Sequence, residues 1–166
     1  MRPPLLATLI WASTTAANAQ IAETGVLWRF EMAGPAAGAA VSVGPDGTVY
    51  ASDADTLYAL TPAGTLRWER AGLGGGRQID FLADGTVIAA ADTAIHALDP
   101  ADGVDLWSFG FDGNGSRESI EVGPNVGPDG NIYAVTSTDG QFGLGAFSLT
   151  PTGTLRWADE GQPRLD

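Results

Sequence analysis

Side chains that could hold a cation occur at two places in the chain. Asp53 and Asp55 stand on either side of one alanine. Asp112, Asn114 and Ser116 alternate with glycines, as oxygen ligands do at the start of a calcium loop. That second segment lacks the glutamate that closes such a loop, and the first falls where a hairpin turn is required. We therefore expect a hairpin turn at the first place and a surface loop over residues 110–119 at the second, and assign no metal site.

Few residues could serve nucleophilic or acid–base catalysis. His96 is the only histidine and the chain has no cysteine, so a catalytic thiol and disulfides are excluded. His96 takes the place of Tyr58 in a segment that recurs through the chain, so we expect a half-buried structural ring. The glycines within residues 72–76 are not followed by a helix signal, which argues against a phosphate-binding loop. No catalytic or cofactor-binding residue is assigned.

The composition predicts an acidic, turn-rich globular protein. Of 166 residues, 44% are hydrophobic, so a core can be buried. Glycine (23 residues) and proline (10 residues) favour many short strands joined by turns. The formal net charge is −12, and all eight basic residues are arginine. Because such a surface repels phosphate backbones, we expect no nucleic-acid partner.

The N-terminus has the pattern of an export signal. Arg2 precedes an apolar run from Leu5 to Trp11, and Ala17-Asn18-Ala19 fits a signal peptidase site. The run is too short to cross a hydrocarbon core of ~30 Å, which needs ~20 residues. We predict a signal peptide over residues 1–19, cleavage before Gln20, and a periplasmic or extracellular protein without a membrane span.

A segment of strand, tight turn and strand ending in tryptophan recurs along the chain. Full copies span 57–68, 97–107 and 147–157, and a partial copy spans 25–28. The tryptophans at 28, 68, 107 and 157 therefore set a period of about 40 residues with one longer interval. Such a period with four strands per unit is typical of β-propeller blades.

We predict an all-β fold, an incomplete β-propeller over residues 20–166. Three blades of four antiparallel strands are expected at about 40–70, 78–109 and 120–158. A leading outer strand is expected at 26–31. No window has the apolar period of a helix.

The repeated residues have a packing purpose in such blades. A tryptophan near the end of the outer strand can lie across the interface with the next blade. It buries ~150–250 Å², and its N–H can bond a neighbouring backbone carbonyl. The glycine four residues earlier permits the tight turn, and the small Ala59 or Ala97 on the preceding strand leaves room for the ring.

The copy from Ala97 to Trp107 reads Ala-x-Asp-x-x-x-Gly-x-x-x-Trp. It resembles the tryptophan-docking motif of pyrroloquinoline-quinone-type (PQQ-like) propeller repeats. Those repeats occur in quinoprotein alcohol dehydrogenases and in a periplasmic propeller of outer-membrane assembly. The resemblance covers about 25–158, with Thr61 and Thr150 where Asp99 stands and turns one residue shorter. Because propellers have ~4–8 blades, three blades imply a fragment or an assembly of short chains.

The resemblance does not transfer a catalytic site. Dehydrogenases of this family use an adjacent cysteine pair, a calcium ion and an aspartate base, and none of these can be placed here, so we assign neither quinone nor calcium. We predict a non-catalytic protein-binding or scaffolding module of the cell envelope. Its partners would be proteins, the rest of a propeller, or a second copy at the open blade edge. An N-terminal fragment of a PQQ-dependent dehydrogenase and a structural repeat region of a larger surface protein are the alternatives.

Overall fold

The computed structural model describes residues 25–35, 38–75, 77–91, 93–110, 118–138 and 141–159. The predicted signal peptide and the segment 112–116 lie outside these residues. The described residues form twelve β-strands and no helix, which confirms the all-β prediction. Within these same ranges there is accordingly no helix long and apolar enough to span a membrane.

The strands form three four-stranded antiparallel sheets, each in simple sequence order. The first sheet contains β1 (Ala40–Val43), β2 (Val49–Ser52), β3 (Thr56–Leu60) and β4 (Leu66–Ala71). The second contains β5 (Asp80–Phe81), β6 (Val87–Ala90), β7 (Ala94–Leu98) and β8 (Asp105–Gly110). The third contains β9 (Glu118–Val126), β10 (Ile132–Thr138), β11 (Gln141–Leu149) and β12 (Leu155–Asp159). Each sheet lies within a few residues of a predicted blade.

Turn chemistry explains where the strands end. Between β1 and β2, the Gly47 N–H donates to the Gly44 carbonyl at 2.9 Å. The Asp46 carboxylate accepts the Thr48 N–H at 2.9 Å, so a side chain of the turn also stabilises it. Gly47 has a φ of +82°, a conformation that L side chains rarely adopt. This Gly-Pro-Asp-Gly turn therefore fixes the register of the hairpin.

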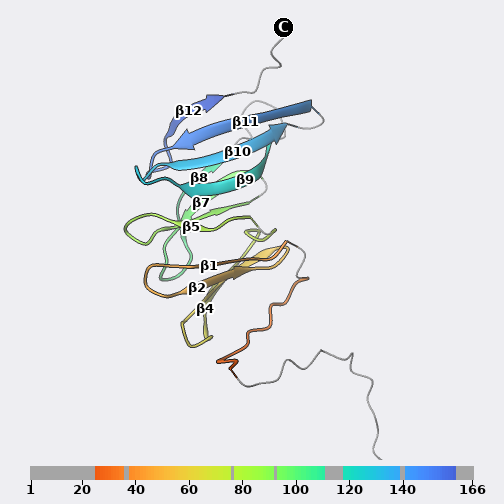
Figure 1. The fold of residues 1–166 in the computed structure, drawn as a ribbon, viewed down its shortest axis with the longest axis vertical. Helices are drawn as coiled ribbons and strands as arrows, with labels where there is room; N and C mark the ends of the chain where they lie inside the picture. The colour runs from red at the N-terminus through yellow and green to blue at the C-terminus, as the bar shows by residue number, and fades with distance from the viewer. Residues whose placement is uncertain are drawn as a thin grey trace, which may run out of the picture.

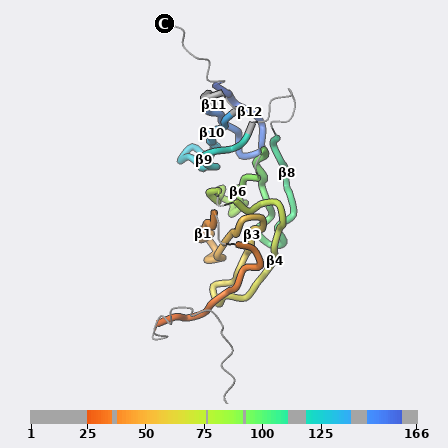
Figure 2. The backbone as a smooth tube through the Cα atoms, turned by 90° about the vertical axis from the view of Figure 1, so that its right-hand side faces the viewer, coloured from red at the N-terminus to blue at the C-terminus, as the bar shows by residue number. Residues whose placement is uncertain are grey.

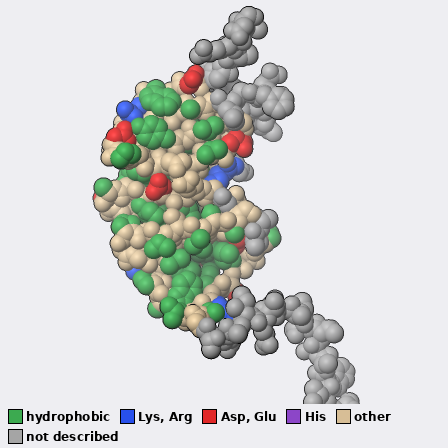
Figure 3. Space-filling view, viewed as in Figure 1, with side chains coloured by type: hydrophobic (Ala, Val, Ile, Leu, Met, Phe, Trp, Pro, Cys, Tyr) green, Lys and Arg blue, Asp and Glu red, His purple; other side chains and the backbone are tan. Residues whose placement is uncertain are grey.

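The three sheets are stacked along the long axis of the molecule (Figure 1). In the side view, β1 and β9 lie on one side of the stack, and β4 and β8 lie on the opposite side (Figure 2). The stack is curved and does not close into a ring, as expected for an incomplete propeller (Figures 2 and 3).

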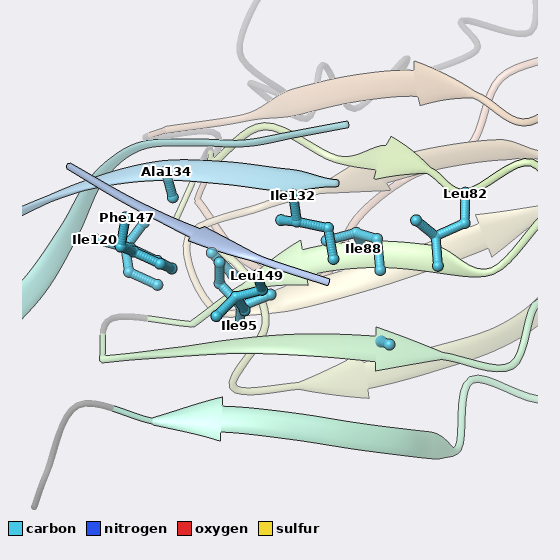
Figure 4. Packing of buried hydrophobic residues seen from close by; sticks show 10 residues of the cluster. Leu82, Ile88, Ile95, Ile120, Ile132, Ala134, Phe147 and Leu149 are labelled. Atoms are coloured by element: carbon cyan, nitrogen blue, oxygen red, sulfur yellow. The ribbon is translucent and has the colours of Figure 1, made fainter. Parts of the chain in front are cut away.

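Two apolar cores lie between successive sheets. Because side chains alternate along a strand, the middle sheet supplies residues to both cores, and every residue of β6 is buried. The core between the first and second sheets includes Tyr50, Leu57, Ala59, Trp68, Ile79, Val87, Ala89 and Leu98. The core between the second and third includes Ile88, Ile95, Ala97, Ile120, Ile132, Phe147 and Leu149 (Figure 4).

The predicted leading strand at residues 26–31 does not form. The structure assigns no strand to this segment. A strand needs a partner backbone, and no described residue pairs with these. The segment is instead held to the first sheet by side-chain contacts of Trp28 and Phe30.

Candidate interaction site: the tryptophan sockets and the open sheet faces

Trp68 joins the first sheet to the second through a socket of two residues. Its indole N–H donates to the Pro100 carbonyl at 3.0 Å. Its ring covers Gly103, where an added Cβ would lie 2.7 Å from ring carbon Cε3. Trp68 is 8% exposed, and Ala59 lies opposite it in the register. We call such a proline carbonyl with its neighbouring glycine a socket.

The same socket occurs three times. The Trp28 N–H donates to the Pro62 carbonyl at 2.9 Å, and the Trp107 N–H donates to the Pro151 carbonyl at 3.1 Å. Their rings cover glycines of the same turns: a Cβ on Gly64 or Gly153 would lie 2.5 or 2.6 Å from the ring. Trp68 and Trp107 therefore lie between successive sheets as expected, and Trp28 joins the N-terminal segment to the first sheet.

The socket turns tolerate the exchange of aspartate for threonine. In the second sheet, Asp99 accepts the Ala101 N–H at 2.8 Å within the turn. In the first and third sheets, the hydroxyls of Thr61 and Thr150 accept a backbone N–H four residues later, at 3.1 and 3.0 Å. Both side chains supply an oxygen that caps the turn, so the departures from the motif leave the socket intact.

The last sheet presents a tryptophan without a socket among the described residues. Trp157 is 44% exposed, and Tyr133 lies beside it with ring centroids 6.3 Å apart. In the first sheet, the corresponding Tyr50 and Trp68 rings lie 5.7 Å apart and are covered by the second sheet. The last sheet thus leaves Trp157 exposed and Tyr133 half-buried, whereas the first sheet buries both of their counterparts.

At the other end, the N-terminal segment covers part of the first sheet. Phe30 makes an edge contact with Tyr58 at 5.4 Å. The buried Asp53 carboxylate accepts the Gly34 N–H and the Tyr58 hydroxyl, each at 2.8 Å. We call this set of contacts, together with Trp28 in its socket, the N-terminal clasp.

Hydrogen bonds from both sides hold the Asp53 carboxylate in place. Its Oδ1 accepts the N–H groups of Asp55 and Thr56 at 3.0 and 2.8 Å, so it closes the turn that the sequence predicts. These backbone bonds, with Tyr58 and Gly34, lower its pKa to about 2. The described part of the chain contains no group of three metal-ligating side chains.

His96 lies on β7 as a half-buried ring, 19% exposed at its side chain. Its Nδ1 is 2.9 Å from Asp105, which also accepts Arg70 Nη2 at 2.8 Å. Burial raises the pKa of Asp105, but the bonds from Arg70 and His96 outweigh it and hold the pKa below its ordinary value. Arg70 also donates to the Gly103 carbonyl at 2.6 Å, so the cluster ties β4 to β8 across two sheets. Sequence reasoning missed this ion pair.

The glycine-rich loop after β4 uses its amides internally. The Gly74 N–H donates to the Asp55 carbonyl at 2.9 Å, and the Gly75 N–H donates to the Asp53 carbonyl at 2.8 Å. Gly74 approaches the Asp55 backbone so closely that a Cβ would collide with it. The loop is therefore built to pack against the 53–55 turn.

Comparison with known proteins gives one family and several similar folds. The profile of the family described as "Outer membrane protein assembly factor BamB" matches residues 15–162. No curated protein sequence matches the chain. BamB from Moraxella catarrhalis is 17% identical, with a TM-score of 0.53, over 73% of this chain and 37% of that one. A europium-containing methanol dehydrogenase is 19% identical, with a TM-score of 0.54, over 67% of this chain and 22% of that one.

These structural likenesses concern the fold, since both identities are low. The chain spans 37% of the BamB structure and 22% of the dehydrogenase structure that it matches. The family profile, in contrast, spans nearly all of the sequence. With its three stacked sheets and tryptophan sockets, the chain belongs to the PQQ-like β-propeller repeat family described by the outer membrane protein assembly factor BamB.

Proposed function

We propose that this chain is a non-catalytic protein-binding module of the cell envelope, secreted to the periplasm or beyond. The observation that carries the proposal is the open face of the last sheet. There Trp157 is 44% exposed, whereas its counterpart Trp68 is 8% exposed against the next sheet. An aromatic face of this kind is suited to another protein surface, where tryptophan and tyrosine are enriched.

Other properties of the chain favour a protein partner. Val122 on the last sheet is also exposed, by 56%. The net charge of −12 disfavours a polyanion. The family description names an assembly factor of the outer membrane, and the export signal predicted at residues 1–19 agrees with an envelope location.

Site-specific photo-cross-linking in intact cells tests the proposal. A photoreactive amino acid replaces Trp157 in one variant and Ala83 in a matched control. Ala83 is exposed in the turn between β5 and β6, away from the open face. We expect a protein adduct from position 157 in the envelope fraction and none from position 83. Equal adducts at both positions, or none at 157, would contradict the proposal.

Titration of the purified chain with PQQ and calcium tests the enzymatic alternative. Saturable quinone binding together with dye-linked alcohol oxidation would replace the proposed binding role by a dehydrogenase role. We expect neither, because no residue of the chain matches the family's catalytic set.

A further inference from the structure

We propose that the last sheet of one copy docks on the first sheet of a second copy. The N-terminal clasp of the second copy lies where the docked sheet would lie, so the clasp blocks the docking. This rests on the proposed function, because it names the partner of the same open face. Three observations carry it: an exposed Trp157 beside a half-buried Tyr133 on the last sheet, a matching face on the first sheet, and a socket of the first sheet that Trp28 fills.

We call the face of the last sheet that carries Tyr133 and Trp157 the donor face. It repeats a face of the first sheet that packs inside the molecule. Residues 127–133 repeat the Gly-Pro-Asp-Gly turn and the tyrosine of residues 44–50. In the first sheet, Tyr50 is 1% exposed and packs on Phe81 of the second sheet at 5.3 Å. The last sheet holds Tyr133 and Trp157 in the same relation, with their neighbour missing from the described residues.

We call the face of the first sheet that carries Val49 and Ala51 the acceptor face. It repeats the face by which the second sheet packs on the first. The β2 sequence Thr48-Val49-Tyr50-Ala51 is repeated at Thr86-Val87-Ile88-Ala89, one sheet later. Val87 and Ala89 bury themselves against the first sheet. Their counterparts Val49 and Ala51 lie on the opposite side of the first sheet from Tyr50, because side chains alternate along a strand.

The part of the acceptor face on β1 is uncovered. Val41 is 72% exposed and Val43 is 62% exposed, both on β1. Aligned on the turn glycine, their counterparts in the second sheet are Ile79 and Phe81. Ile79 is 6% exposed, and Phe81 packs against the core that holds it. The first sheet therefore offers apolar side chains where the second sheet uses them for packing.

The part of the acceptor face at the turn between β3 and β4 is blocked by Trp28 of the same chain. Trp28 fills the socket of Pro62 and Gly64 so closely that a Cβ added at Gly64 would lie 2.5 Å from the ring. A second indole cannot enter this space, so Trp28 and an incoming Trp157 exclude one another. The contacts of Phe30 and Asp53 keep Trp28 in place.

The assembly is head-to-tail, because two different faces meet. Such an interface closes into a ring or continues as a filament, according to the rotation between copies. The sheets described in two docked copies number six, which falls within the ~4–8 blades of known propellers. Since each copy carries a net charge of −12, added salt should strengthen the association by screening the repulsion.

Sedimentation of purified full-length variants tests the exclusion. W28A empties the socket and should lower the self-association Kd at least about tenfold, because the docking-competent state is no longer rare. W28A/W157A should return to the monomer. G64A is the matched control: it also expels Trp28, but its methyl group ruins the socket, so it should stay monomeric. Phe30→Ala loosens the same segment but leaves Trp28 able to return to the socket, so it should associate more tightly than the wild type and less tightly than W28A.

The inference is overturned if W28A and Phe30→Ala associate no more tightly than the wild type, if the W28A complex survives W157A, or if G64A associates equally. Circular dichroism and urea midpoints of each variant establish that the sheets are intact. An adduct of another envelope protein at position 157, with W28A remaining monomeric, would leave the proposed function standing and refute this inference alone. Absence of both would refute both.

Discussion

At the scale of single residues, Asp53 connects the N-terminal segment to the first sheet. Its carboxylate accepts four hydrogen bonds, from the N–H groups of Asp55, Thr56 and Gly34 and from the Tyr58 hydroxyl. These bonds favour the charged form, which is why its pKa lies at about 2 instead of 3.8. Because the pKa of Asp53 is lower in the folded than in the unfolded chain, its carboxylate stabilises the fold at pH values above 3.8. This stabilisation is lost as the pH falls through about 2.

The first prediction concerns Asp53→Asn. We expect the variant to be less stable than the wild type at neutral pH, since asparagine cannot supply the same charged acceptor. The difference in unfolding free energy should shrink as the pH falls from 3.8 through about 2, where the wild-type carboxylate is protonated. Urea denaturation of both proteins across this pH range measures it. Asp129, whose pKa is also about 2, is present in both proteins and cancels. A difference independent of pH would contradict the prediction.

The second prediction concerns the socket glycine Gly103. Gly103 and Gly85 both have positive φ, +73° and +90°. A Cβ on Gly103 would strike the Trp68 ring at 2.7 Å, whereas the nearest atom to a Cβ on Gly85 is 4.0 Å away. Alanine at Gly85 should cost about 1–2 kcal/mol from the backbone alone. Alanine at Gly103 should cost about 1–3 kcal/mol more, because the ring must move. Equal urea midpoints for the two variants would contradict this.

At the scale of the elements, the outer strands β4, β8 and β12 carry equivalent tryptophans in unequal surroundings. Trp68 is buried against the next sheet, and Trp157 on β12 is 44% exposed. The difference arises from position in the stack and not from the strand sequence, since both follow the same Gly-Thr-Leu-Arg-Trp pattern.

The third prediction compares alanine at these two tryptophans. Trp68→Ala should destabilise the chain by about 3–5 kcal/mol, as truncation of a buried tryptophan does. Trp157→Ala should cost about 1 kcal/mol or less in the monomer, because its site is open to water. Urea denaturation in dilute protein, where association is negligible, measures both. Similar losses of stability would mean that the Trp157 ring is covered in solution.

The strand expected at residues 26–31 shows why element prediction fails at the end of a stack. The sequence Val26-Leu27-Trp28 has the residue types of an outer strand, but no described backbone lies beside it to form a ladder. Its tryptophan still finds a socket, because that contact needs only one turn of the first sheet.

At the scale of the whole molecule, the export signal predicts where the protein works. The fourth prediction is that the chain recovered from the periplasm or the medium begins at Gln20. Its intact mass should lack residues 1–19, whereas the chain retained in the cytoplasm keeps Met1. Ala19→Arg places a large charged side chain at the cleavage position and should block processing. An uncleaved wild-type chain outside the cytoplasm would contradict the predicted signal peptide.

Local sequence determined the three four-stranded sheets, the turns and the repeat, because each strand of a sheet pairs with its neighbour along the chain. The strand predicted at residues 26–31 has no such neighbour among the described residues and did not form. The Gly-Pro-Asp-Gly turns, the period-two side chains and the spaced tryptophans predicted three sheets and placed an indole between each pair. Only the tertiary structure decided which turn receives each indole, since the donor and acceptor are 32 to 44 residues apart. The contact of Asp53 with Gly34 and the Arg70–Asp105 pair were likewise beyond sequence reasoning. The position of a carboxylate, in a turn or on a strand, does not indicate which distant group will reach it. The exposure of Trp157 was decided by the stack alone, because burial of a blade face depends on whether another sheet lies against it.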